Sequence, residues 1–115
     1  MKSSKRDLAL ILIMVLCLSV NVFAHKMRVE ASVESGATIV GSAHYHRTPV
    51  ANAEVRVIAP DGKVLLKTKT NAEGEFRFEA THRCDLLINV IDTGHKGKAT
   101  IPAEDLPADL PPYKP

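Results

Sequence analysis

Residues 27–34 read MRVEASVE, so apolar and polar residues alternate at every position. The apolar members are the odd-numbered residues and the polar members the even-numbered ones. An alternation with a period of two is typical of a β-strand that buries one face and exposes the other. Ser35-Gly36 follows directly and indicates a turn. The segment therefore predicts the first strand of a half-buried sheet.

Similar short runs continue to residue 101, separated by turn signals such as Asp61-Gly62 and Asp92-Thr93-Gly94. The run at 85–91 is apolar on both faces, which predicts a central strand. No segment has a convincing helical period, and one helical turn is possible at 102–106. Short strands at this spacing are typical of a sandwich. We therefore predict a single all-β domain at 25–102, a seven-stranded β-sandwich, followed by a proline-rich C-terminal tail at 103–115. The seven predicted strands are 27–34, 38–46, 54–59, 63–69, 75–79, 85–91 and 95–101.

The first 24 residues differ from the rest of the chain. Basic residues occur before Leu8, an apolar run of about 13 residues follows, and the segment ends in Val22-Phe23-Ala24. These are the three parts of a secretory signal peptide, and the apolar run is shorter than the roughly 20 residues that span a bilayer. We predict a signal peptide at 1–24 that is cleaved after Ala24. The mature protein would then begin at His25, be periplasmic or secreted, and contain no membrane span.

Composition excludes several classes of function. Without residues 1–24 the chain keeps 12 basic and 12 acidic residues, so it carries no strongly basic face for nucleic acid. Cys84 would be the one remaining cysteine, which rules out an intramolecular disulfide. The chain has no Gly-x-Ser-x-Gly or His-Glu-x-x-His motif. We therefore expect a binding protein rather than an enzyme.

Strand direction predicts where the histidines lie. If successive strands run alternately up and down, His25, His46 and His95 lie at one end of the sandwich and His82 at the other. Matching the apolar faces of the first two strands predicts that Lys26 lies opposite His46. The further predicted pairs are Val33 with Ile39, Val29 with Ala43, Met27 with Tyr45 and Arg28 with His44.

A second register, shifted by one residue, would pair His25 with His46 instead. In either register residue 25 lies beside His46. His44 and His46, two apart on one strand, should share a face, about 6.6 Å apart along it.

An N-terminal histidine can close a chelate ring on a metal ion through its amine and its imidazole. The amine has a reference pKa of about 8, so a metal ion displaces its proton at little cost near neutral pH. Imidazole suits nickel, copper, zinc and iron. The candidate metal ligands are His25, His95, His46 and His44. The alternative is that each of these side chains is simply solvated.

Three stretches carry a resemblance to a known module: Pro49–Val57, Pro60–Lys63 and Thr70–Phe78. Together they resemble the carboxypeptidase regulatory-like domain, with its pattern P-V-x-x-A-x-V-x-V, then D-G, then T-(D/N)-x-x-G-x-F-x-F. This resemblance implies an immunoglobulin-like or transthyretin-like β-sandwich. The module serves many extracellular roles, so it implies little about function.

A narrower resemblance covers nearly the whole mature chain. Ala24-His25-Lys26, the alternating run 29–34 and Gly94-His95-Lys96 are similar to segments of the small periplasmic accessory components of nickel/cobalt energy-coupling-factor transporters. The resemblance implies a periplasmic protein that binds nickel or cobalt and passes it to the membrane components of a metal transporter. It supports His25 and His95 as ligands, whereas His46 and His44 depend on the predicted register.

Two other functions remain open from the sequence. The chain could be a copper-handling periplasmic β-sandwich protein, although Met27 is the one methionine after residue 24 and copper(I) carriers are rich in methionine. It could also be a metal-free extracellular interaction module. Metal binding that raises stability separates the first two functions from the third.

Overall fold

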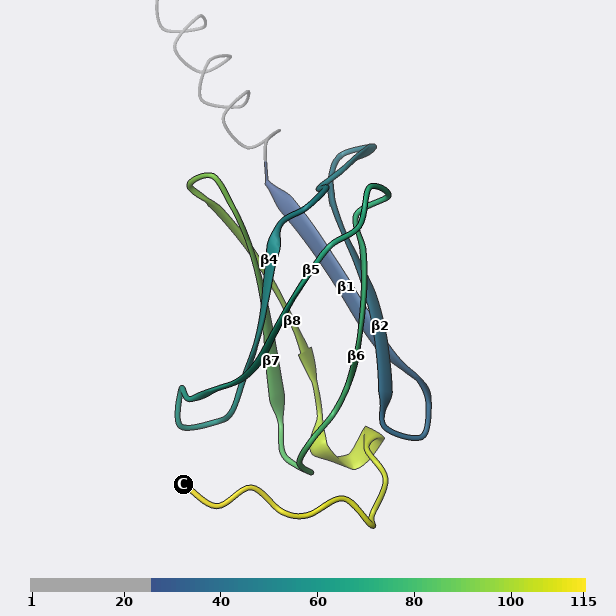
Figure 1. Ribbon diagram of the computed structural model, residues 1–115, viewed down its shortest axis with the longest axis vertical. Helices are drawn as coiled ribbons and strands as arrows, with labels where there is room; N and C mark the ends of the chain where they lie inside the picture. Colours follow the sequence, from purple (N-terminus) through teal and green to yellow (C-terminus); the bar gives the residue numbers. More distant parts are fainter. Residues whose placement is uncertain (1–25) are drawn as a thin grey trace, which may run out of the picture.

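Two antiparallel β-sheets form the described part of the chain, residues 26–115, in a computed structural model (Figure 1). The predicted signal peptide and His25 lie outside the described residues. The strands are β1 (Met27–Ser35), β2 (Thr38–Tyr45), β3 (Thr48–Pro49), β4 (Glu54–Ile58), β5 (Val64–Lys69), β6 (Glu75–Glu79), β7 (Leu86–Asp92) and β8 (His95–Ile101).

The first sheet contains β1, β2 and β6, with β2 in the middle and the short β3 also paired to β2. The second sheet has the order β5-β4-β7-β8. β7 therefore lies between two neighbours, as the apolar residues on both of its faces predict. Residues 26–115 contain no helix that is long and apolar enough to cross a membrane.

All seven predicted strands are present, with every end within one residue of its predicted position. The prediction of seven strands was nevertheless one short, because Thr48–Pro49 pairs with His44 and Tyr45 and forms β3. Two residues carry no periodicity, so the alternation pattern could not reveal this strand.

Inward-facing side chains of the two sheets make the core. Fully buried residues come from both sheets and follow the period of two within each strand, as in Val55 and Val57 of β4. Each such side chain stabilises the fold by roughly 1.5–3 kcal/mol relative to an exposed one. The largest fully buried residues are Ile39, Leu86, Ile88, Ile101, Val55, Val57 and Val90.

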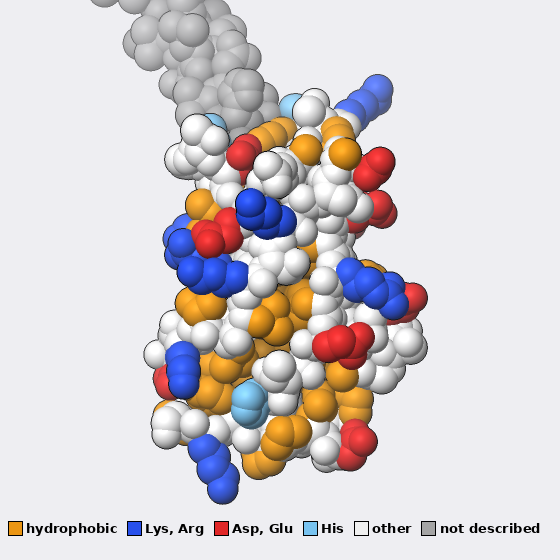
Figure 2. Space-filling model, viewed as in Figure 1, with side chains coloured by type: hydrophobic (Ala, Val, Ile, Leu, Met, Phe, Trp, Pro, Cys, Tyr) orange, Lys and Arg blue, Asp and Glu red, His pale blue; other side chains and the backbone are white. Residues whose placement is uncertain are grey.

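One side of the sandwich is closed where β8 approaches β1. A Cβ on Gly97 of β8 would lie 2.6 Å from Cγ2 of Val29 and 2.9 Å from Sδ of Met27, both on β1. Any other residue at position 97 would force the side chains of Val29 and Met27 to shift. On the face drawn in Figure 2, apolar side chains reach the surface between groups of charged residues.

The predicted tail packs across the end of the sandwich opposite the start of β1 (Figure 1). Its first residues form a single 3₁₀ turn at Ala103–Asp105, and Leu106 is buried. The backbone N–H of Arg83 donates to the carbonyl of Pro111 at 2.8 Å. The Tyr113 hydroxyl lies 2.8 and 2.9 Å from the carboxylate oxygens of Asp61. The chain turns again at 107–110, where the N–H of Leu110 donates to the carbonyl of Pro107, and these contacts make residues 103–115 part of the packed domain.

Candidate functional site

The two sheets bring distant histidines to one end of the molecule. β1 begins and β2 ends at this end, and the β7–β8 turn is there too (Figure 1). It holds His46 and His95, and we call it the histidine end. His82 lies at the opposite end, where its ring meets that of Tyr113 at a centroid distance of 5.8 Å. The up-and-down argument from the sequence is thereby confirmed for these three histidines.

The predicted register of the first hairpin is also confirmed. Met27 pairs with Tyr45, Arg28 with His44, Val29 with Ala43, and Val33 with Ile39. The register follows from the alternation, because a slip by one residue would turn Met27 and Ile39 toward solvent. Both side chains are in fact buried.

His95 lies against Tyr45. The two rings meet edge to face with centroids 5.5 Å apart, which joins β8 of one sheet to β2 of the other. Thr93 and Gly94 make the β7–β8 turn, and both have positive φ, as two-residue hairpin turns require. This turn places Asp92 directly across from His95.

The Tyr45 hydroxyl donates to Oδ2 of Asp92 at 3.4 Å, a long hydrogen bond. Burial raises the pKa of Tyr45, and the negative charge and hydrogen bond of Asp92 raise it further. The sequence analysis did not identify Tyr45 or Asp92 as site residues. The signal was present in the predicted register, which paired Tyr45 with Met27 at the start of the first strand.

His44 and His46 lie differently from the prediction. β2 ends at Tyr45, and His46 and Arg47 form a two-residue turn into β3. His46 has a φ of 53°, in the left-handed region that favours glycine. The two histidines are therefore not successive outward residues of one strand. They still share one surface hollow of about 430 Å³, lined also by Arg28 and Glu30.

The three candidate ligands among the described residues, His44, His46 and His95, do not form one cluster. Tyr45 and Ala43 face the core side of β2, so His44 between them faces the other side of the sheet, away from His95. Among residues 26–115, no three His, Cys, Asp or Glu side chains gather as a metal site would need. His25 is not among these residues, so the statement does not extend to a site built on it.

Chain length limits where His25 can be relative to this end. His25 precedes Met27 by two residues, and two residues span at most about 7 Å. Met27 is 5% exposed and begins β1 at the histidine end. A ligand contributed by residue 25 is thus covalently tied to the end that holds His46 and His95.

Buried hydrogen bonds of Thr70 support the loop beside this end. The Thr70 hydroxyl donates to the carbonyl of Val50 at 2.6 Å and accepts from the backbone N–H of Ala53 at 2.8 Å. Thr70 is 4% exposed, so bulk water cannot reach the site to replace its hydrogen bonds with Val50 and Ala53. The Thr70 side chain thus adds two buried hydrogen bonds to the backbone hydrogen bonds that hold the loop between β3 and β4.

Cationic side chains were the feature of this end that sequence reasoning missed. Lys26, Arg28, Arg47 and Lys98 line a hollow of about 590 Å³ together with His46. They come from three separate segments of the chain, so no local pattern joins them.

Comparison with known proteins identifies no relative: no family model matches the chain, and neither does any curated protein or solved structure.

Proposed function

We propose that this protein is a periplasmic metal-binding accessory protein that captures nickel or cobalt and passes the ion to the membrane components of a transporter. The ligands in this proposal are the amine and imidazole of His25, with His95 or His46 as the further ligand. The observation that carries it is the convergence of His46, His95 and the start of β1 at one end of the fold.

The proposal includes export and processing. A free His25 amine exists only if the chain is cut after Ala24, as the signal-peptide pattern predicts. For the fold we propose an immunoglobulin-like or transthyretin-like sandwich of the carboxypeptidase regulatory-like kind. The two antiparallel sheets and the Asp61-Gly62 turn between β4 and β5 support it.

The exposure of the imidazoles supports capture and release rather than permanent binding. His46 and His95 are both exposed, and in the described residues neither ring makes a hydrogen bond that would fix its tautomer. Structural metal sites usually orient their histidines by such bonds. A site with few preset contacts suits a protein that must give up its ion again.

Calorimetric titration with nickel, cobalt and copper(II) tests the proposal. The chain should be exported and processed, its N-terminus confirmed by mass spectrometry, and compared with a chain carrying one extra residue before His25. Tight binding only with the free N-terminal His25 is expected. A free metal concentration of 100 times the Kd should also raise the free energy of unfolding by about 2.7 kcal/mol.

Single substitutions then assign the other ligand. We expect His95→Ala or His46→Ala to weaken binding at least ten-fold, which is about 1.4 kcal/mol. His82→Ala is the matched control, because it removes a histidine at the opposite end. Preference for copper would support copper handling instead. Equal and weak binding in all chains would refute the metal function and leave a metal-free interaction module.

A further inference from the structure

Four cationic side chains line a hollow at the histidine end, and one proposed metal ligand, His46, lines it as well. The cations are Lys26, Arg28, Arg47 and Lys98, and the volume of the hollow is about 590 Å³. Met27 and Val29 contribute the apolar part of its lining. We call it the cationic hollow.

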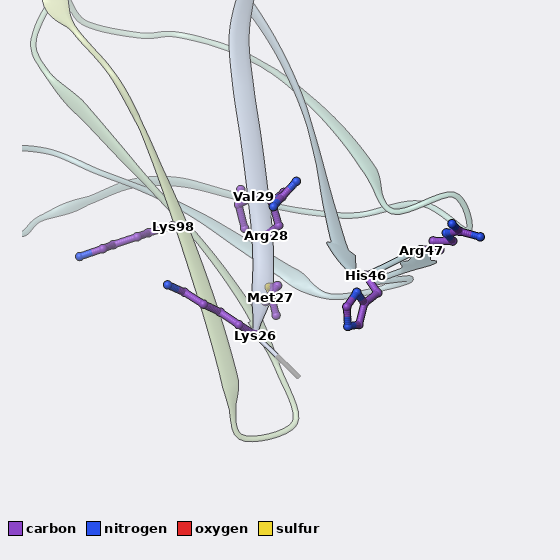
Figure 3. A pocket seen from close by; sticks show the side chains of 7 residues that line it. All are labelled: Lys26, Met27, Arg28, Val29, His46, Arg47 and Lys98. Atoms are coloured by element: carbon purple, nitrogen blue, oxygen red, sulfur yellow. The ribbon is translucent and has the colours of Figure 1, made fainter. Parts of the chain in front are cut away.

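The hollow runs across the beginning of β1. In Figure 3 the side chains of Lys26 and Lys98 extend on one side of this strand, whereas His46 and Arg47 lie on the other side. Arg28 projects from β1 between them. The closure of β1 against β8 at Gly97 is what brings Lys98 to the same place as the β2–β3 turn.

None of the four cations of the hollow forms an ion pair within residues 26–115. Within residues 26–115 the ion pairs are Arg56–Glu54, Lys67–Glu54 and Arg77–Glu34, and none involves a cation of the hollow. No acidic residue lines the hollow. Glu30 lines the neighbouring hollow, to which Arg28 and Arg47 also contribute.

This concentration of charge is local. Acidic and basic residues nearly balance in the whole chain, whose formal net charge is +2. Like charges gathered in a concave surface repel one another and raise the local concentration of counter-ions. A bound anion would remove this repulsion, so the arrangement favours one.

We propose that the cationic hollow binds a small multivalent oxyanion whose carboxylate or phosphate groups are held by Arg28 together with Lys26 and Lys98, with Arg47 adding positive charge from the other side of β1. Guanidinium groups match carboxylate and phosphate oxygens in a two-pronged geometry, and ammonium groups add charge. The volume falls within the usual range of about 300–1,000 Å³ for small-ligand sites. The inference does not depend on metal binding, although an anionic polycarboxylate chelate of a metal ion belongs to the same ligand class.

Titration with citrate and with inorganic phosphate, in the absence of added metal, tests this site. We expect binding by calorimetry that weakens as salt rises, since salt shortens the range of electrostatic attraction. The double variant Arg28→Gln with Lys98→Gln should bind at least ten-fold more weakly. The control is Lys63→Gln with Lys114→Gln, which removes the same charge from exposed positions outside the hollow and should bind as the parent does. Thermal unfolding of each variant confirms that it is folded.

A second arm identifies the source of the anion. Vesicles of phosphatidylglycerol are compared with vesicles of phosphatidylcholine, again with both double variants. Citrate or phosphate binding assigns a free anion, and binding to the anionic vesicles alone, lost with Arg28 and Lys98, assigns lipid headgroups. No binding in either arm, or equal weakening by the control variant, would overturn the proposal. His95→Ala should leave anion binding unchanged, so failure here is distinct from failure of the metal site.

Discussion

Replacing Thr70 by valine should destabilise the protein far more than its small change in shape suggests. Valine has nearly the same shape, but it removes a hydroxyl that donates to Val50 at 2.6 Å and accepts from Ala53 at 2.8 Å. Each lost hydrogen bond contributes about 1 kcal/mol, and an unsatisfied buried partner adds a penalty of about 1–3 kcal/mol. The backbone hydrogen bonds between Thr70 and residues 52–53 remain, which limits the loss. We expect a decrease of about 2–4 kcal/mol in the free energy of unfolding.

Thr70→Ser is the matched control for this experiment. It keeps the hydroxyl and removes one methyl group, which costs about 1 kcal/mol at a buried position. Urea unfolding followed by circular dichroism suits a chain without tryptophan. With a slope of about 1.5 kcal/mol per molar urea, a loss of 3 kcal/mol lowers the midpoint by about 2 M. If the valine variant is as stable as the serine variant, the two hydrogen bonds do not support the loop as described.

Three further predictions concern the β1–β8 contact, the tail and the turn at His46. Gly97→Ala should reduce the free energy of unfolding, measured with urea, by about 1–3 kcal/mol through overpacking. Adding Val29→Ala should recover part of the lost stability. An unchanged free energy of unfolding in Gly97→Ala would mean that there is room for a side chain at position 97. The Tyr113 hydroxyl is the main cause of the lowered pKa of Asp61, so Tyr113→Phe should move it up toward the ordinary value of 3.8 in a carboxyl titration by NMR. Because a lowered folded-state pKa contributes stability above the unfolded pKa and loses it as pH falls, this variant should show a shallower acid dependence below pH 3.8; an unmoved pKa would refute the Tyr113 contact. His46→Gly should leave the free energy of unfolding unchanged or raise it by up to about 1 kcal/mol, because glycine accepts positive φ without strain. The same variant should bind metal more weakly if His46 is a ligand. A clear loss of stability would show that the imidazole supports the fold instead.

The strands and the first hairpin register could be predicted because alternation is a local signal with a strict period. Shifting residues 27–34 by one position would expose Met27 and Val29, so one register was strongly favoured. The same reasoning placed His46 and His95 at one end. These features needed only the order of apolar and polar residues along the chain.

The remaining features depend on contacts that leave no periodic trace. The positive φ of His46 has no sequence signal, because glycine or asparagine would normally mark such a position. The tail binds through Arg83 and Tyr113, and proline-rich segments have no period from which a docking site can be read. The cationic hollow joins residues from β1, the β2–β3 turn and β8. Only the closure of the sandwich brings these residues together.

The tight contact of β8 with β1 bears on the proposed removal of residues 1–24. Met27 is buried under Gly97 and lies three residues after Ala24, the residue at which we expect cleavage. A peptidase binds an extended length of chain on both sides of the bond that it cuts. Once β1 has docked, that length is unavailable without local unfolding of the strand. If residues 1–24 are a signal peptide, as we propose, we expect its removal to precede the docking of β1.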